Sequence, residues 1–210
     1  MKSRYLLFTI ALFLGMTPAF GGYIDFTAPG FSAIDGESSW STTIDGITID
    51  FTAYPAGATF YYDNNAGFKD GLGIVYAWED DETEYPEYWE ISFSESVLWN
   101  YAKITDLFNE WGYLEIGSYS YTYDGTPSGE FFFTADPGQT IGDTYGEYTL
   151  NVDQYVDSIY FYGYDYVGDE KQNHEFSVGG IDITKVPEPS TLLLLSTGLL
   201  VGTAFRKRLN

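Results

Sequence analysis

The chain has 210 residues and a formal net charge of −22 at pH 7, from 31 acidic and 9 basic residues. Five of the nine basic residues lie near the two ends, so the centre of the chain is strongly acidic. Nucleic-acid binding is excluded, because phosphate contacts require a basic face. The chain has no cysteine and a single histidine, His174, which excludes disulfides and thiol chemistry and argues against a His-based triad.

Aromatic residues make up 20% of the chain. Disordered acidic segments are poor in aromatic residues, so this composition indicates a folded protein with a sizeable core. The length predicts a single domain between the two ends. Without disulfides, that domain must stay folded through burial alone.

Residues 1–21 have the features of a secretory signal peptide. Lys2 and Arg4 give a positive start, and an apolar run follows from Tyr5 to Gly15. Small residues, Ala19 and Gly21, occupy the −3 and −1 positions of a cleavage site after Gly21. Cleavage after Ala19 is the alternative. The alternative, a first transmembrane helix, is disfavoured because the apolar run is short and small residues follow it.

Residues 22–185 are β-like throughout. From Ile47 to Ala53, apolar and polar residues alternate, which is typical of a strand with one buried face. The four clearest alternating runs are 47–53, 89–94, 118–123 and 159–164.

Turn sequences such as Asp45-Gly46 and Asp124-Gly125 separate these runs. Short strands at this spacing predict an all-β fold, an antiparallel β-sandwich of jelly-roll-like type. Only residues 103–111 show a helical pattern of apolar positions. The sandwich is expected between the signal peptide and a single C-terminal transmembrane helix.

An acidic stretch provides a candidate metal site. Calcium takes six to eight oxygen ligands from carboxylates, amides and carbonyls. The spacing does not match the Asp-x-Asp-x-Asp-Gly calcium loop, so a solvated acidic loop is the alternative interpretation. The candidate Ca²⁺ ligands are Asp63, Asp70, Glu79, Asp80, Asp81 and Glu82.

A tyrosine stripe, formed by Tyr160, Tyr162 and Tyr164, provides a candidate glycan-stacking surface. Alternate residues of a strand share one face, so an exposed row of tyrosines could stack on sugar rings. The alternative is a structural role as cross-strand aromatic pairs.

A weaker signal is the stretch from Glu90 to Glu95, which faintly resembles the Glu-x-Asp-x-x-Glu strand of jelly-roll β-glucanases. Those enzymes need an acid and a nucleophile that flank the scissile bond. Here the central aspartate is replaced by Ser92, and two glutamates in an acid-rich chain are expected by chance. The chain is therefore not expected to be an enzyme.

The last 25 residues, 186–210, differ from the rest of the chain. Residues 190–205 carry no charge, and Arg206, Lys207 and Arg208 follow directly. A helix of these sixteen residues would rise about 24 Å, against a bilayer core of about 30 Å. The three cations would hold its end in the cytoplasm. Val186 and the Pro-Glu-Pro sequence that follows it should be extended, because proline disfavours helix at the preceding residue.

The set formed by Pro187-Glu188-Pro189, the short Leu-rich span and the terminal basic cluster resembles the PEP-CTERM protein-sorting signal of Gram-negative bacteria. The resemblance implies an inner-membrane intermediate and recognition by an exosortase, a membrane cysteine transpeptidase that would cut at or near Pro187-Glu188-Pro189. It also implies a destination at the cell surface or in the exopolysaccharide matrix. The alternative, a buried C-terminal helix, would alternate polar and apolar faces.

The centre of the chain is also similar to domains that often precede this signal, in residues 70–74, 89–93 and 104–108. Together these features predict an exported structural or interaction protein of the cell surface or extracellular matrix. The alternative is a carbohydrate-binding module, assisted by calcium, for the cell's own exopolysaccharide.

Overall fold

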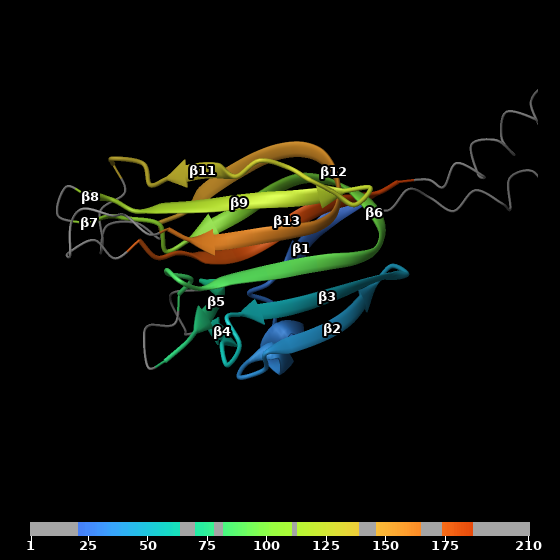
Figure 1. The fold of residues 1–210 in the computed structure, drawn as a ribbon, viewed down its shortest axis with the longest axis horizontal. Helices are drawn as coiled ribbons and strands as arrows, with labels where there is room; N and C mark the ends of the chain where they lie inside the picture. The colour runs from blue at the N-terminus through green and yellow to red at the C-terminus, as the bar shows by residue number, and fades with distance from the viewer. Residues whose placement is uncertain are drawn as a thin grey trace, which may run out of the picture. The chain divides into compact units, whose positions relative to one another are not determined.

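The computed structural model describes residues 21–63, 70–77, 82–110, 113–138, 146–164 and 174–186. Figure 1 shows that the regular elements of these residues are β-strands, together with one short 3-10 helix. The elements are β1 (Gly21–Asp25), η1 (Pro29–Ile34), β2 (Ser39–Ile44), β3 (Ile47–Tyr54), β4 (Thr59–Asp63), β5 (Gly71–Val75), β6 (Tyr88–Thr105), β7 (Asn109–Glu110), β8 (Tyr113–Leu114), β9 (Ile116–Tyr123), β10 (Thr126–Pro127), β11 (Phe131–Thr134), β12 (Tyr148–Gly163) and β13 (Ser177–Lys185).

The expected antiparallel all-β architecture is confirmed. Eleven strands form one sheet, in which the order β10-β9-β12-β6-β13-β5-β4 is the main path. Branches from this path place β11 on β9, β1 on β13, and β3 with β2 on β6, while β7 and β8 pair separately. The strands thus join in one continuous sheet. The finer assignment to a jelly-roll-like sandwich stays a prediction, because bent strands can also connect the two layers of a sandwich.

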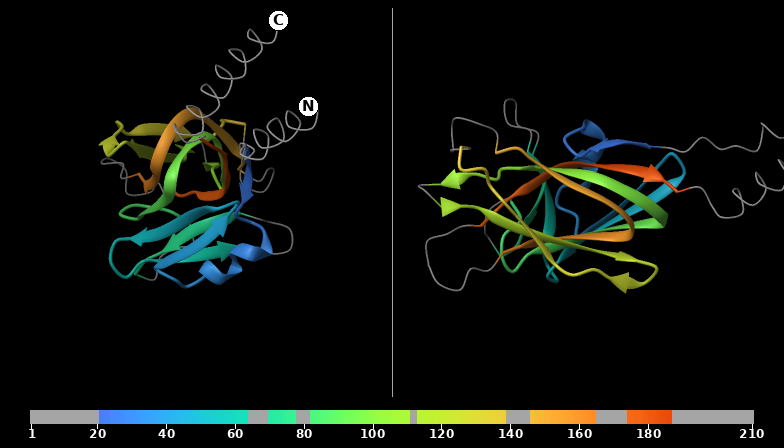
Figure 2. Two further views of the ribbon diagram at one scale, coloured as in Figure 1. Left: turned by 90° about the vertical axis from the view of Figure 1, so that its right-hand side faces the viewer. Right: turned by 90° about the horizontal axis from the view of Figure 1, so that it is seen from above.

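Two long strands explain this continuity. β6 and β12 pair antiparallel along most of their length, with register shifts between Asn151 and Gln154 and between Val156 and Ser158. Such bulges bend a strand and increase its twist, and Asp153 adopts a positive φ of 51° at the first of them. Figures 1 and 2 show both strands curving, so that the sheet folds over on itself.

The core lies inside this folded sheet. In β3 the residues from Ile47 to Ala53 at odd positions are buried, and in β6 the same holds for Trp89, Ile91 and Phe93. Burying a large apolar side chain contributes about 1.5–3 kcal/mol. Phe51 contacts the rings of Phe26, Phe31, Trp40, Phe60 and Trp89, with centroids 5.6–6.4 Å apart.

One glycine permits a close approach of the loop before β6. A Cβ atom at Gly163 would lie 2.0 Å from the carbonyl carbon of Glu84, so no larger residue fits there. The Gly163 amide donates a hydrogen bond to the Glu87 carbonyl, 2.9 Å away. The loop thereby packs on the end of β12 and sets the start of β6 at Tyr88.

The predicted helical pattern at residues 103–111 does not form a helix in its described part. Ile104 belongs to β6 and pairs with Tyr148 of β12. Asp106 then has a positive φ of 53°, and the Leu107 amide donates to the Gly146 carbonyl, 3.1 Å away. Pairing with β12 therefore overrides the local helical spacing of the apolar residues.

Residues Gly21–Thr184 form one compact unit. Its first strand, β1, lies beside its last strand, β13, with Gly21 paired to Thr184. Within the described ranges, no helix has the length and apolar character that a membrane span requires. The signal sequence up to residue 20 and the predicted span at 190–205 lie outside the described residues.

Candidate interaction face

The strand register assembles a row of aromatic side chains on the solvent side of the sheet. Tyr54 of β3 pairs with Tyr88 of β6, which pairs with Tyr162 of β12. The row continues through Ser118 of β9 to Phe132 of β11. The neighbouring residues along β3, β6 and β12 are buried, so the row residues on those strands point away from the core.

The three tyrosine rings of this row stack on one another. The centroids of Tyr54 and Tyr88 are 4.5 Å apart at an interplanar angle of 6°, and those of Tyr88 and Tyr162 are 5.5 Å apart at 28°. Tyr160 adds a fourth ring, 6.3 Å from Tyr162 at 17°. Cross-strand aromatic pairs contribute about 0.5–1.5 kcal/mol each beyond their burial. The row therefore stabilises the pairing of β3, β6 and β12.

A second row runs beside the first and is polar. Its members in strand order are Ser39, Thr52, Glu90, Tyr160 and Ser120. The Tyr160 hydroxyl donates to Oε1 of Glu90 at 2.9 Å. This row therefore places a carboxylate and a phenol in direct contact at the middle of the sheet.

Burial and this carboxylate raise the pKa of three phenols of the face, those of Tyr54, Tyr160 and Tyr162. Burial raises the pKa of Tyr160 to about 12, and the hydrogen bond to Glu90 adds to the shift. Burial also raises the pKa of Tyr162, whose hydroxyl shares a 2.9 Å hydrogen bond with Ser120. Burial is the main cause that raises the pKa of Tyr54, and the charge of Glu90 is the next largest.

A third row completes the surface and consists of Ser41, Asp50, Ser92, Ser158 and Thr122. We call the three rows together the outer face. Its groups are aromatic rings, phenols, hydroxyls and two carboxylates, and none of its named members is lysine or arginine. The hydroxyls of Ser118 and Ser158 are buried beneath this face. Such a surface offers hydrogen bonds to a neutral polar partner and repels an anionic one.

The three tyrosines that the sequence grouped have different surroundings in the structure. Tyr160 and Tyr162 lie on the outer face within β12, whereas Tyr164 follows β12 directly and contacts the ring of Phe132, another member of the face, and the ring of the buried His174, with centroids 5.4 and 5.7 Å away. Stacking within the row supports the cross-strand structural interpretation, and glycan stacking stays a prediction. Sequence reasoning missed Tyr54 and Tyr88, because only the strand register brings them to the row.

Of the candidate calcium ligands, Asp63 and Asp70 come together. They flank the connection between β4 and β5, and Asp70 is 9% exposed. Burial and, second, the charge of Asp63 raise the pKa of Asp70 to about 6, although a hydrogen bond with Asp106 acts in the opposite direction. Glu82 lies in the loop before β6, and residues 79–81 lie outside the described residues. Within the described ranges, no three acidic or histidine side chains are grouped to hold a metal ion, and calcium binding stays a prediction.

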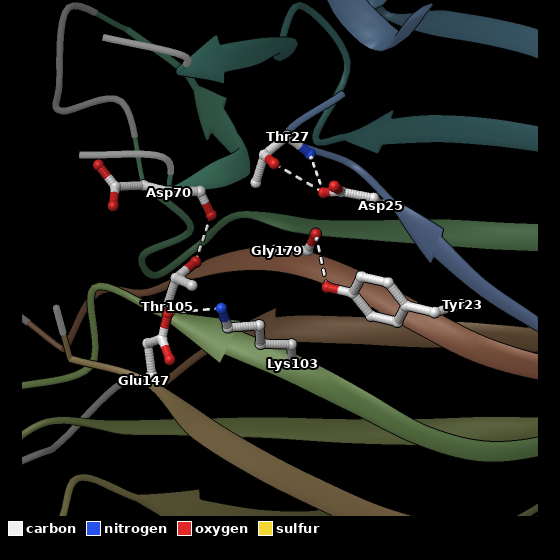
Figure 3. Close-up of polar contacts among 8 residues, drawn as sticks. All are labelled: Tyr23, Asp25, Thr27, Asp70, Lys103, Thr105, Glu147 and Gly179. Atoms are coloured by element: carbon white, nitrogen blue, oxygen red, sulfur yellow. Dashed lines mark hydrogen bonds and ion pairs between the residues drawn. The ribbon is translucent and has the colours of Figure 1, made fainter. Parts of the chain in front are cut away.

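Polar contacts near this site join strands (Figure 3). The Thr105 hydroxyl donates to the Asp70 carbonyl, which ties β6 to the start of β5. The Tyr23 hydroxyl donates to the Gly179 carbonyl at 3.1 Å, which ties β1 to β13. Lys103 and Glu147 form an ion pair at 2.5 Å beside β12. An exposed pair of this kind contributes about 0.2–1 kcal/mol.

The two glutamates of the glucanase-like stretch do not share a regular face. Glu90 and Glu95 are five residues apart, and side chains of a strand alternate between faces. Glu90 points to the outer face, in the same strand as the buried Trp89 and Ile91. The expectation that the chain is not an enzyme stays a prediction.

A family model of the PEP-CTERM protein-sorting motif matches residues 185–208. No curated protein and no solved structure matches the chain. The match covers the Pro-Glu-Pro sequence, the apolar span and the basic cluster, and it begins at Lys185, the last residue of β13. The chain therefore carries the PEP-CTERM protein-sorting motif, which supports its sorting by an exosortase to the cell surface.

Proposed function

We propose that the chain is an exported structural or interaction protein of the cell surface or the exopolysaccharide matrix. In this proposal the signal peptide starts export, and the apolar span with Arg206, Lys207 and Arg208 halts the chain in the inner membrane. An exosortase then cuts at or near Pro187-Glu188-Pro189. The observation that carries the proposal is the match to the sorting motif at residues 185–208.

The position of the motif supports a cut that would free the β domain with almost none of the C-terminal tail attached. β13 extends to Lys185, where the motif begins, so only Val186 separates the last strand from the Pro-Glu-Pro sequence at which an exosortase would cut. A cut near Pro187 would remove about 20 residues, the span and its basic end. The surface form would then consist of the acidic β domain.

The test is to replace Pro187-Glu188-Pro189 by Ala-Ala-Ala in cells that express an exosortase. The substitution removes the rigid extended strip and leaves the apolar span intact. The wild type is expected at the surface or in the medium in a shortened form. The mutant is expected in the inner-membrane fraction at full length. Equal fractionation of both, with Asn210 retained, would show that the tail is a plain anchor.

A second candidate function is a carbohydrate-binding module for the cell's own exopolysaccharide. The outer face favours it, because its hydroxyls, phenols and two carboxylates match the hydrogen-bonding groups of a sugar chain. The stacked tyrosines already cover part of each other's ring faces, so recognition would depend mainly on hydrogen bonds. Calcium bound by the acidic loop would assist such binding.

Electrophoresis of the full chain in gels that contain the exopolysaccharide tests this candidate. Tyr160→Phe and Glu90→Gln each remove one hydrogen-bonding group from the outer face, and both should reduce the retardation of the wild type. Tyr85→Phe is the matched control, because Tyr85 is exposed and outside the three rows. Equal mobility of the wild type with and without polysaccharide counts against the module.

A further inference from the structure

The chain has 20 tyrosines and no cysteine, so disulfides cannot cross-link it after export. Tyrosine is the side chain through which an oxidant could form a carbon–carbon cross-link. Four described tyrosines are exposed: Tyr23, Tyr85, Tyr123 and Tyr155. Two of these four, Tyr123 and Tyr155, are in ring contact with each other, with centroids 5.9 Å apart at an angle of 34°.

Hydrogen bonds to the Asp157 side chain hold together the two segments that carry this pair. Tyr123 ends β9, directly before the Asp124-Gly125 turn, and Tyr155 lies in β12 between its two register shifts. Asp157 connects the two segments, because its Oδ2 accepts from the Asp124 amide at 2.6 Å. Its Oδ1 accepts from the hydroxyl of Ser96 at 2.5 Å, so Asp157 also links β12 to β6.

Both rings of the pair remain free to approach each other. Tyr123 is 46% exposed and Tyr155 is 49% exposed, and exposed side chains change rotamer in picoseconds to nanoseconds. By contrast, Tyr54 and Tyr88 are closer, at 4.5 Å, but lie nearly parallel and half-buried. Parallel packed rings must separate and turn before their edges can join. The exposure and the tilt of their rings therefore favour oxidative coupling of Tyr123 with Tyr155.

We propose that Tyr123 and Tyr155 form an oxidative cross-linking site that yields an intramolecular dityrosine. The oxidant is a one-electron oxidant of the heme-peroxidase class, supplied with hydrogen peroxide. Each phenol loses one electron and one proton, and the two radicals join through the ring carbons ortho to their hydroxyls. The hydrogen on each joined carbon then moves to the oxygen and restores the aromatic ring. The two electrons and two protons reduce one hydrogen peroxide to two waters.

The cross-link would tie β9 to β12 covalently. It would restrict the unfolded chain as a disulfide does, and so raise the melting temperature of a domain that has no disulfide. Its formation does not depend on the sorting motif, so a negative result leaves the proposed sorting untouched.

The test treats the folded full-length protein, in mild detergent, with a heme peroxidase and limiting hydrogen peroxide. Peptide mass spectrometry should find one dominant intramolecular product that joins the peptides of Tyr123 and Tyr155 and lacks two hydrogens. The melting temperature of the treated protein should rise. Tyr155→Phe, and separately Tyr123→Phe, should lose both the product and the rise.

Tyr54→Phe is the matched control, because it removes a phenol from the closer but packed pair, and it should keep the product. In urea the product should fall to the level of other tyrosine pairs, which shows that the fold selects it. Circular dichroism of each variant before oxidation verifies folding. A dominant product at Tyr54 and Tyr88, no dityrosine in the wild type, or an undiminished rise in Tyr155→Phe would overturn the proposal.

Discussion

The stacked tyrosine row predicts a measurable coupling between β3, β6 and β12. Tyr88 lies between Tyr54 and Tyr162, with centroid distances of 4.5 and 5.5 Å. Each such contact contributes about 0.5–1.5 kcal/mol. Tyr88→Ala removes both contacts and is expected to lower the free energy of unfolding by about 1–3 kcal/mol.

A double-mutant cycle isolates the closer contact. Tyr54→Ala, Tyr88→Ala and the double variant are unfolded with urea and followed by tryptophan fluorescence and circular dichroism. The coupling energy should be about 0.5–1.5 kcal/mol. Tyr88→Phe is the control, because it keeps the ring, and it should retain most of the stability. Additivity within about 0.3 kcal/mol would mean that the rings do not stabilise each other, and would refute the reasoning.

Three further predictions concern the core, the buried carboxyl and calcium. Phe51→Ala, inside the aromatic core, should cost about 3–5 kcal/mol in urea unfolding, whereas Tyr85→Ala at an exposed site should stay within about 0.5 kcal/mol; similar losses would contradict the core assignment. The pKa of Asp70 is raised to about 6, so its protonated form favours the folded state and its contribution to stability is lost as pH rises from about 4 through 6. Asp70→Asn should remove this part of the pH dependence, and an unchanged stability–pH curve would contradict it. Melting should rise in millimolar calcium, and Asp80→Asn with Asp81→Asn should blunt the rise; equal melting in calcium and chelator would favour the solvated loop.

Period-two patterning predicted the strands well, because one buried face imposes alternation. The run from Ile47 to Ala53 and the run from Trp89 to Ser94 both fall in strands with the expected inward residues. The pattern could not reveal that β6 and β12 continue through bends and belong to one sheet. Bulges such as that at Asp153 depend on pairing between distant segments, and local sequence carries little information about it.

The outer face, too, could be predicted only in part, because sequence does not show which distant strands pair. The sequence indicated that Tyr160 and Tyr162 share a side of one strand, which follows from alternation alone. The stacking partners, Tyr54 and Tyr88, lie more than 70 residues away in the chain and become neighbours only through the strand register. The contact between Tyr160 and Glu90 has the same origin. The sorting motif was readable from sequence because its residues are contiguous in the chain.

The intact mass of the surface form, compared between cells with and without exosortase, tests the central claim most directly. With exosortase, the account predicts a protein that begins near Gly22, lacks the apolar span and the basic cluster, and ends near Pro187. Without exosortase, it predicts a chain that keeps Asn210 and stays with the inner membrane. A surface form that ends at Asn210 in both kinds of cell would contradict the account.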